Sequence, residues 1–480
     1  RPQCTLDMIT FLLSIAFLIG GYIIYGKFVD RFFGADPART TPAIEKADGV
    51  DFKVLPTWKI FVIQFLNIAG LGPIFGAIMG AAYGPIAYLW IAIGCVFMGA
   101  VQDYFSGMLS VRNGGLNMPD IIGKYLGKGV KTIMSIVVPF LLLAVGVSFV
   151  TGPADLLQSL SGMNKNIWLY IIFAYYILAT LLPIDKIIGN IYPIFGGALL
   201  FMAVGVGVAL IYNGAVGNVT IPNLTLDSFQ NYHRDPANNI VIPMLFVVIS
   251  CGAISGFHST QSPLMARCLK TEKHARPVFY GAMIAEGIVA MIWATAAMTY
   301  FGGPEGLNAA GVTPAVAVNE ICNSWLGKAG AILAVIGVIA CPITSGDTAF
   351  RSLRLTLADL FRIDQKAVVK RILVSLPIFA LAYFCCQVDF STLWKYVGIG
   401  NQILATIVMW TATGYLLKVK KPHWMCSIPA TFLTYVCVCY FIVAPAINGG
   451  LHLAPVIGHI AGVVAAFAAL FTVLKTSASR

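Results

Sequence analysis

Uninterrupted apolar stretches of about 18 or more residues recur along the whole chain, and short polar segments separate them. Folded as an α-helix, a stretch of this length crosses a hydrocarbon core of about 30 Å. The strands of a membrane β-barrel would instead show alternating hydrophobicity over about 10 residues. The pattern therefore predicts an all-α polytopic membrane protein with about 13 transmembrane helices. We expect them at residues 8–26, 58–82, 86–110, 130–152, 167–184, 187–212, 239–264, 277–301, 329–350, 370–386, 392–417, 423–447 and 453–474.

The composition supports a location within the bilayer. Hydrophobic residues make up 58% of the 480 residues and charged residues only 11%, whereas a soluble domain carries about 25% charged residues. The first apolar stretch lacks a basic start and a cleavage site of the A-x-A kind, so we interpret it as a retained membrane helix rather than a signal peptide. The 11 cysteines include no C-x-x-C pair, and we expect them to act as small apolar residues without a metal or redox role.

The positions of the basic residues predict the orientation in the membrane. The formal net charge of +11 would by itself suit a nucleic-acid-binding protein. Across the predicted crossings, however, 26 of the 31 Lys and Arg residues fall on one side. Under the positive-inside rule that side is the cytoplasm, which places the amino terminus outside and the carboxyl terminus inside the cytoplasmic membrane, with no nucleic-acid partner. The opposite side has only Arg1, Lys165, Arg234, Lys328 and Lys395.

Two predicted spans contain helix-breaking residues near the middle of the membrane. Residues 67–73 include two glycines and a proline, and proline removes a helix hydrogen bond and clashes with the preceding turn. Residues 254–260 place a glycine among four polar side chains at comparable depth. Packing kinks that neighbouring helices satisfy are the alternative interpretation. The candidate solute-binding residues in these breaks are Asn67, Ala69, Gly70, Leu71, Gly72, Pro73, Ser255, Gly256, Phe257, His258, Ser259 and Thr260.

The two interrupted spans enter the membrane from opposite sides, and each opens a set of five helices. This arrangement is typical of an inverted repeat, in which matching discontinuous helices form the solute site near the midplane. Helical spacing of apolar residues also predicts an external helix at residues 313–326. The predicted regions are an additional amino-terminal helix with a cytoplasmic loop (1–57), the first repeat (58–212), the second repeat (239–417) and two carboxyl-terminal helices (418–480).

A broken helix leaves unpaired N–H groups at the start of one half and unpaired carbonyls at the end of the other. The N–H groups attract anions and the carbonyls attract cations. The amides of residues 70–75 therefore suit a carboxylate, whereas the carbonyls of residues 67–70 suit Na⁺ or a protonated group. The sequence favours an anionic or zwitterionic solute.

Few ionisable residues lie inside the predicted spans, where they are costly and usually functional. They are Asp103, Lys186, His258, Glu286 and Asp347. Glu286 is the deepest carboxylate, roughly 14 Å into its span at 1.5 Å per residue, and it is a candidate to exchange protons with His258. A structural pair is the competing interpretation. Asp103 and Asp347 serve either in coupling or in ion pairs with nearby arginines. These arginines are Arg112, Arg351 and Arg354.

Hydroxyl groups cluster in residues 341–348, where a proline and a glycine again predict an interruption of the helix. We expect this span to end near residue 350. Oxygen ligands suit a hard cation, so Thr344 and Ser345 are candidates to complete a Na⁺ site with carbonyls of the first interrupted span. These residues leave both H⁺ and Na⁺ open as the coupling ion.

Six stretches keep their order and spacing across both predicted repeats. They are IAGLGPIFGAIMGAAYGP (68–85), LWIAIGCVFMGAVQDYFSGMLSVRNGG (89–115), PIDKIIGNIYPIFGGALL (183–200), CGAISGFHSTQSPLMARCL (251–269), GDTAFRSLRLTLADLF (346–361) and GIGNQILA (398–405). Together they resemble the carbon starvation protein A family of transporters. The resemblance implies a LeuT-type fold and uptake of peptides or pyruvate, with H⁺ more often proposed as the coupling ion than Na⁺.

The same resemblance implies roles for particular residues. It adds Asn401 and Gln402 to the candidate solute-binding residues. Two positions depart from the family pattern: Ala77 stands where many members have a second proline, and Gln102 where a histidine often precedes the aspartate. The other residues that carry over are Gly70, Leu71, Gly72, Pro73, Asp103, Lys186, Ser255, Gly256, Phe257, His258, Glu286, Asp347 and Arg351.

These observations predict a cation-coupled secondary transporter that imports a small carboxylate-bearing nutrient, a peptide or pyruvate, by alternating access. H⁺ is favoured over Na⁺, no cofactor is expected, and the partners are the solute and the lipid bilayer. A membrane channel is one alternative. An intramembrane enzyme built on His258 with Glu286 or Asp103 is another, although the sequence contains neither an H-E-x-x-H zinc motif nor a G-x-S-x-G nucleophile motif.

Overall fold

The computed structural model describes residues 8–47, 52–181, 184–363 and 367–478, and in these ranges it contains helices and turns without a β-strand. Short π-helical turns, η1 (Gly21–Tyr25), η2 (Gly72–Gly76), η3 (Cys95–Gly99) and η6 (Arg276–Tyr280), connect or begin several helices. The α-helices are α2 (Ile9–Gly20), α3 (Gly26–Phe33), α4 (Pro42–Glu45), α5 (Thr57–Ile68), α6 (Ala77–Ala81), α7 (Ile86–Gly94), α8 (Ala100–Arg112), α9 (Met118–Leu126), α10 (Lys128–Ser161), α11 (Lys165–Leu181), α12 (Ile184–Val216), α13 (Val241–Val248), α14 (His258–Ala266), α15 (Gly281–Tyr300), α16 (Pro304–Ala310), α17 (Pro314–Phe361), α18 (Val368–Cys385), α19 (Phe390–Lys418), α20 (Trp424–Val443) and α21 (Pro455–Ala478).

Length and apolar composition identify the described segments that can cross a membrane. Nine pass this test, and ten pass if the bent pair formed by α5 and η2 with α6 counts as one span. The described chain therefore has the character of a multi-pass membrane protein. The predicted count of about 13 would also require α11, α13 with α14, and α19 to cross. Of these, α11 is short for a membrane span at 17 residues, and the break between Val248 and His258 separates α13 from α14.

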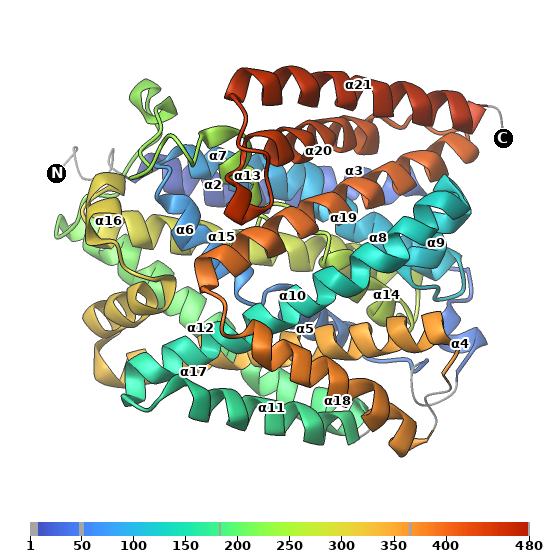
Figure 1. Cartoon of the computed structure of the whole chain (residues 1–480), viewed down its shortest axis with the longest axis horizontal. Helices are drawn as coiled ribbons and strands as arrows, with labels where there is room; N and C mark the ends of the chain where they lie inside the picture. Colours follow the sequence, from blue (N-terminus) through green and yellow to red (C-terminus); the bar gives the residue numbers. More distant parts are fainter. Residues whose placement is uncertain (1–7, 48–51, 182–183, 364–366, 479–480) are drawn as a thin grey trace.

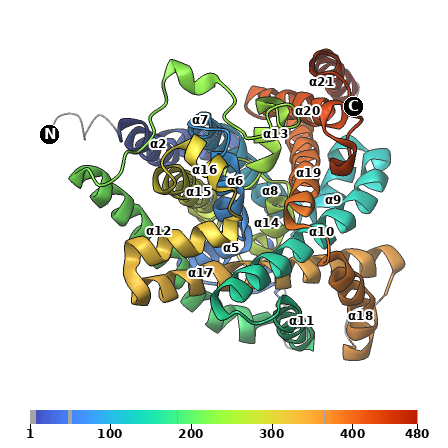
Figure 2. The same cartoon turned by 60° about the vertical axis from the view of Figure 1, so that its left-hand side comes forward.

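The helices form a bundle whose long members run along one common direction (Figure 1). α20 and α21 lie on one flank and α11 and α18 on the opposite one, as the turned view also shows (Figure 2). α10 packs against α17 and α19, and α12 packs against α5 and α17. The apolar part of α15 is 83% buried, whereas that of α21 is only 17% buried. α15 is therefore at the centre of the bundle, and the exposed apolar face of α21 is suited to contact with lipid.

The first predicted break is present. α5 ends at Ile68, η2 begins at Gly72, and the helical segments on the two sides are inclined by 53°. Pro73 has no N–H to donate to a preceding turn. A Cβ at Gly72 would overlap the side chain of Cys251. The proline therefore explains the bend. The missing side chain at Gly72 allows the backbone of the first break to pack closely against Cys251 in the second break.

The second predicted break is also present, but it begins earlier than expected. α13 ends at Val248 and α14 begins at His258, so the non-helical segment is 249–257 and the last three residues of the predicted break are already helical. Gly256 lies against α19, where a Cβ would overlap the backbone of Asn401. The Gly256 N–H donates to the Asn401 carbonyl at 3.1 Å. α19 thus supplies hydrogen bonds that the interrupted helix cannot supply itself.

The predicted end of the ninth span near residue 350 is wrong, because α17 continues through Pro342 to Phe361. Pro342 and Gly346 do not interrupt this helix, and the hydroxyls around them bond back onto it: Thr344 donates to the Cys341 carbonyl at 2.7 Å and Thr348 to the Ser345 carbonyl at 2.9 Å. Such local bonds satisfy the polar side chains without opening the helix. The sharp turn of α17 lies instead at Gly327 (φ 65°, ψ 176°), so residues 314–326 form a separate helix before the span, as predicted.

Candidate functional site

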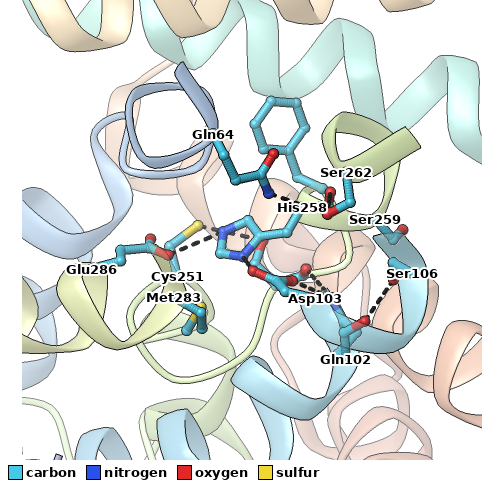
Figure 3. A network of polar contacts seen from close by, with 12 residues as sticks. Gln64, Gln102, Asp103, Ser106, Cys251, His258, Ser259, Ser262, Met283 and Glu286 are labelled. Atoms are coloured by element: carbon cyan, nitrogen blue, oxygen red, sulfur yellow. Dashed lines mark hydrogen bonds and ion pairs between the residues drawn. The ribbon is translucent and has the colours of Figure 1, made fainter. Parts of the chain in front are cut away.

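The imidazole of His258 lies between two carboxylates at the centre of the bundle (Figure 3). Its Nδ1 is 3.0 Å from Oδ2 of Asp103, and its Nε2 is 3.4 Å from Oε2 of Glu286. All three side chains are fully buried. They come from α14, α8 and α15, so the two halves of the chain together form this triad of Asp103, His258 and Glu286.

Polar contacts hold the triad in place. Nε2 of Gln102 donates to the Ser255 carbonyl at 2.6 Å and lies 3.4 Å from Oδ1 of the adjacent aspartate. Oγ of Ser262 donates to the His258 carbonyl at 3.1 Å, and Nε2 of Gln64 donates to Oγ of Ser262 at 3.2 Å. These bonds connect α5, α8 and α14 around the site (Figure 3). The glutamine at position 102, which departs from the family pattern, therefore joins α8 to the second break.

The electrostatics of the triad depend on its protons. Two acids and one base are removed from water, and a buried charge is costly unless it is paired. Among the described side chains, Nε2 of His258 and both oxygens of Glu286 have no hydrogen-bond partner of good geometry. A proton between these two groups would give each of them a partner. The arrangement can therefore take up or release a proton with little movement of the side chains.

Cys251 adds a thiol to this region. Its Sγ lies 3.5 Å from Oγ of Ser255, and possible ligand atoms of Cys251, His258 and Glu286 lie within 4.8 Å of one another. Sulfur, nitrogen and oxygen donors at this spacing could be reached by one transition-metal ion. This cysteine was not singled out from the others in the sequence, and the expectation that the cysteines have no metal or redox role stays a prediction. The sequence did contain one indication, because Cys251 is the first residue of the stretch 251–269 that also contains His258.

The two breaks approach each other. A Cβ at Gly252 would lie 3.9 Å from Cα of Pro73. The ring of Phe149 covers Gly70 and makes an edge contact with Phe257, with ring centroids 5.8 Å apart. Ala69, Leu71 and their neighbours in the first break are buried. The structure therefore brings most of the predicted solute-binding residues together around one buried region.

Four predicted solute-binding residues make contacts within the protein. Asn401 accepts from the Phe257 N–H at 3.0 Å through Oδ1, and Nε2 of Gln402 donates to the Phe246 carbonyl. Oγ of Ser259 donates to the Gly256 carbonyl at 2.6 Å. Oγ1 of Thr260 donates to the Phe257 carbonyl at 2.7 Å. In this conformation these groups support the shape of the second break.

The predicted cation site brings α17 to the end of α5. Oγ of Ser345 donates to the Leu66 carbonyl at 2.7 Å and lies 3.0 Å from the Cys341 carbonyl. Asn67 is buried one residue beyond Leu66, and its Oδ1 has no hydrogen-bond partner among the described groups. A hydroxyl and two carbonyl oxygens therefore meet here, and oxygens are the ligands that Na⁺ and other hard cations prefer. Thr344 instead bonds within its own helix.

The remaining ionisable candidates separate into different environments. Asp347 lies 3.5 Å from Arg351 in the next turn of α17, which is the structural pair considered above. The suggested pair of Asp103 with Arg112 is wrong, because Asp103 contacts His258 and Arg112 contacts Glu272. The reason is that α8 carries Asp103 in its first turn and Arg112 at its last residue. The side chain of Lys186 lies outside the residues that the structure describes.

Comparison with known proteins identifies relatives of this chain. The model of the family "Carbon starvation protein CstA" matches residues 7–154 and 131–325. An uncharacterized membrane protein of Haemophilus influenzae is 44% identical over 63% of this chain and 94% of its own length. The peptide transporter CstA of Campylobacter jejuni is 26% identical over 86% of this chain and 76% of its own length. The pyruvate/proton symporter BtsT of Escherichia coli is 25% identical over 59% of this chain and 48% of its own length.

Solved transporter structures show a similar fold. Mhp1, a nucleobase-cation-symport-1 family transporter in a closed conformation with bromovinylhydantoin bound, gives a TM-score of 0.56 at 14% identity over 88% of this chain and 92% of its own. MhsT in complex with L-phenylalanine gives a TM-score of 0.54 at 12% identity over 88% of this chain and 99% of its own. Both are LeuT-type transporters, and at this identity the likeness concerns the fold alone.

Proposed function

Because the chain belongs to the carbon starvation protein CstA family, which comprises membrane transporters and not enzymes, we propose that it imports a small carboxylate-bearing nutrient, a peptide or pyruvate, by cation-coupled alternating access. The observation that carries this proposal is the meeting of two interrupted helices at the buried triad of Asp103, His258 and Glu286. The named relatives supply the two solute classes, since one is called a peptide transporter and another a pyruvate/proton symporter.

The proposed architecture has 13 crossings and two inverted five-helix repeats, residues 58–212 and 239–417. Residues 1–57 and 418–480 add one helix before the repeats and two after them. The interrupted segments α5–η2 and α13–α14 each begin a repeat, which supports this division. The charge distribution supports an amino terminus outside and a carboxyl terminus inside the cytoplasmic membrane.

The proposed coupling mechanism follows from charge. The amides near Gly70 and Gly72 suit the carboxylate of a solute, but the acids of the triad would repel that carboxylate in a medium of low dielectric constant. Protonation of the triad removes part of the repulsion, so solute and proton stabilise each other's binding. Release of the proton on the cytoplasmic side then weakens solute binding. This reciprocal effect is what couples the two movements.

Na⁺ is the second candidate for the coupling ion. The observation that favours it is the contact of Ser345 with the Leu66 carbonyl beside the first break. We favour H⁺, because the triad places three buried ionisable groups directly after the second break, and we place Asp103 and Glu286 in the coupling step. Asp347 and Lys186 are also proposed to take part in ion coupling. The candidate solute-binding residues in and around the two breaks likewise remain a proposal.

Uptake by purified protein in liposomes tests this function. Labelled pyruvate, a dipeptide and a tripeptide would be offered under an inward proton gradient, an inward Na⁺ gradient, or neither. We expect accumulation of at least one of these solutes under the proton gradient and its loss on adding a protonophore. Uptake that ignores both gradients would remove the coupling claim. A conductance far above the turnover of a carrier would instead indicate a channel.

A further inference from the structure

A cavity of about 820 Å³ lies away from the triad, at the end of the bundle where loops 217–240 and 301–313 are found. Its walls include the loop residues Arg234 and Asp235 and the start of α19, and Phe75 and Val248 also line it. Phe75 belongs to η2, which follows the first break, and Val248 is the last residue before the second. The cavity therefore lies directly beyond the two breaks.

An aromatic layer separates the cavity from the breaks. The ring centroids of Phe75 and Phe390 are 5.7 Å apart, and those of Phe390 and Trp394 are 5.6 Å apart. Nε1 of Trp394 donates to the Val248 carbonyl at 3.1 Å. Phe75 and Phe390 line the cavity, whereas Trp394 is buried and does not line it. A solute in the cavity would thus be separated from the triad by this closed layer of aromatic side chains.

The distribution of basic residues singles out this cavity. Of the five basic residues predicted on the extracellular side, three line it: Lys165, Arg234 and Lys395. The positive-inside rule depletes that side of positive charge, so topology gives no reason for three of them to share one cavity. Attraction of an anion does give such a reason.

The acidic residues of the cavity are already satisfied. Asp155 forms an ion pair with Lys165 at 2.7 Å. Oδ2 of Asp389 accepts the N–H groups of the first turn of α19 at 3.1 and 3.2 Å. Asp235 accepts from the side-chain amide of Asn238 at 3.0 Å. All three carboxylates therefore have hydrogen-bond partners, but only Asp155 has a cationic one, and the charges of Asp235 and Asp389 attract Lys395 across the cavity.

Two cations of the cavity lack such partners. Among the described residues, neither the guanidinium of Arg234 nor the ammonium of Lys395 makes a salt bridge within 4.0 Å or a side-chain hydrogen bond. The backbone of Arg234 is nevertheless fixed, because its N–H donates to Oδ1 of Asn308 at 2.9 Å. Burial lowers the pKa of the neighbouring His233, so its ring is neutral at neutral pH. The cations of the cavity that no close ion pair occupies are thus Arg234 and Lys395.

We propose that Lys395 and Arg234 form an entry site for the carboxylate of the solute, outside the aromatic layer and before the triad. The inference rests on the proposed function and adds a second binding position to it. The volume lies within the roughly 300–1,000 Å³ of sites that take drug-sized ligands, so the cavity accommodates a dipeptide or tripeptide as well as a smaller acid. Lys395, half-buried at the base, holds the carboxylate, and Arg234, exposed in the loop, attracts it from solution.

Kinetics of uptake in liposomes test the entry site. We expect Lys395→Gln and Arg234→Gln each to raise the KM for a carboxylate-bearing solute about 3- to 10-fold, the low end of the rate effects of electrostatic steering, with little change in kcat. The KM of the wild type should rise with ionic strength, and that of the double variant should not. Lys395→Arg should recover most of the affinity. Lys328→Gln is the matched control, because this lysine is exposed on the same predicted side but does not line the cavity.

A peptide with an amidated carboxyl terminus separates carboxylate binding from structural damage. Any transport of this peptide should have the same KM in the wild type and in the variants, because it has no carboxylate for Lys395 and Arg234 to hold. A KM that stays unchanged in both single variants, or an equal loss for free and amidated peptide, would overturn the entry site while leaving wild-type uptake intact. Absence of uptake in the wild type would instead overturn the proposed function. Arg234 is in an exposed loop, so its variant remains informative if Lys395→Gln does not fold.

Discussion

His258 and Asp103 are separated by 155 positions in the chain, yet Nδ1 of the histidine lies 3.0 Å from Oδ2 of the aspartate. The contact joins the start of α14, immediately after the second break, to the first turn of α8. Glu286 approaches the other ring nitrogen, so a change of charge on one member alters the protonation of the other two. Substitutions that remove a single charge can therefore separate coupling from folding.

Glu286→Gln should abolish proton-driven accumulation and leave solute exchange across the liposome membrane measurable. The amide keeps the size of the side chain but carries no exchangeable proton at the carboxyl group, so the carrier can still alternate with solute bound. Counterflow of labelled against unlabelled solute measures the retained activity. Glu305→Gln, a change at an exposed acid, should leave both activities intact. Equal loss of accumulation and exchange would place Glu286 in solute binding or folding instead.

His258→Ala should weaken solute binding at least tenfold. The substitution removes the base between two buried acids, so their mutual repulsion and the empty volume both alter the region where the breaks meet. Stabilisation of the purified protein against heat by increasing solute concentrations gives the apparent affinity. His459→Ala offers a control, because His459 contacts Tyr435 on the outer flank of the bundle. An unchanged affinity in His258→Ala would show that the solute binds elsewhere.

Much of this arrangement could be predicted from local sequence. Apolar runs identified the membrane helices, and Gly72 with Pro73 marked the first break. Hydrophobicity and helix breaking both depend on residues that are close together in the sequence. The resemblance to the CstA family is confirmed by the family match. The contact of Asp103 with His258 was not favoured over a pair with Arg112, because Arg112 is much nearer in the sequence. In the structure, α8 holds Asp103 and Arg112 at its opposite ends, and His258 contacts Asp103. Cys251 was not singled out, although it lies in the same stretch of the chain as His258.

Two other features could not be predicted from the sequence. The helix α17 continues past residue 350, and the hydroxyls near Pro342 bond to carbonyls of their own helix. The proposed entry site could not be predicted from the sequence either. Arg234 and Lys395 are 161 positions apart, so only the fold reveals that they line one cavity.

Gly256→Ala should destabilise the protein by about 1–3 kcal/mol, the range for overpacking a tight contact. The added methyl group would meet the Asn401 carbonyl and the backbone of Ala405, neither of which can move without moving α19. Thermal or denaturant unfolding in detergent measures the loss. In Gly197→Ala the methyl group meets nothing within 4 Å, and better helix propensity should make that variant neutral or slightly more stable. Similar effects in both would mean that the contact of Gly256 with α19 is not tight.

Ser345→Ala should cost about 1 kcal/mol of stability, the usual value of one hydrogen bond, because the Leu66 carbonyl loses its donor. If H⁺ is the coupling ion, adding Na⁺ should not raise the melting temperature of the wild type or of this variant. The measurement is a melting curve in choline chloride and in sodium chloride at equal ionic strength. A Na⁺-dependent increase that disappears in Ser345→Ala would instead establish Na⁺ binding at this position and favour Na⁺ coupling.

Glu272→Gln should destabilise the protein by roughly 3 kcal/mol, the cost of removing one partner of a buried pair. The guanidinium of Arg112 binds both oxygens of Glu272, at 2.6 and 2.7 Å, and the glutamate side chain is fully buried. Oε2 also accepts the N–H of Asp36 at 2.7 Å. The pair therefore connects the loop after α3 and the short 3₁₀ helix η5 (Glu272–His274) to the last residue of α8, at the end of the bundle away from the cavity.

The surface pair of Asp120 and Lys131 provides the comparison for Glu272→Gln. Its atoms also approach to 2.7 Å, but both side chains are 46% exposed, and exposed pairs contribute about 1 kcal/mol or less. Asp120→Asn should therefore change the free energy of unfolding much less than Glu272→Gln. In alternating access the cytoplasmic end must open, so Glu272→Gln should also favour the inward-open state and slow proton-driven accumulation more than exchange. Equal, small effects of the two substitutions would show that the Arg112–Glu272 pair does not hold that end closed.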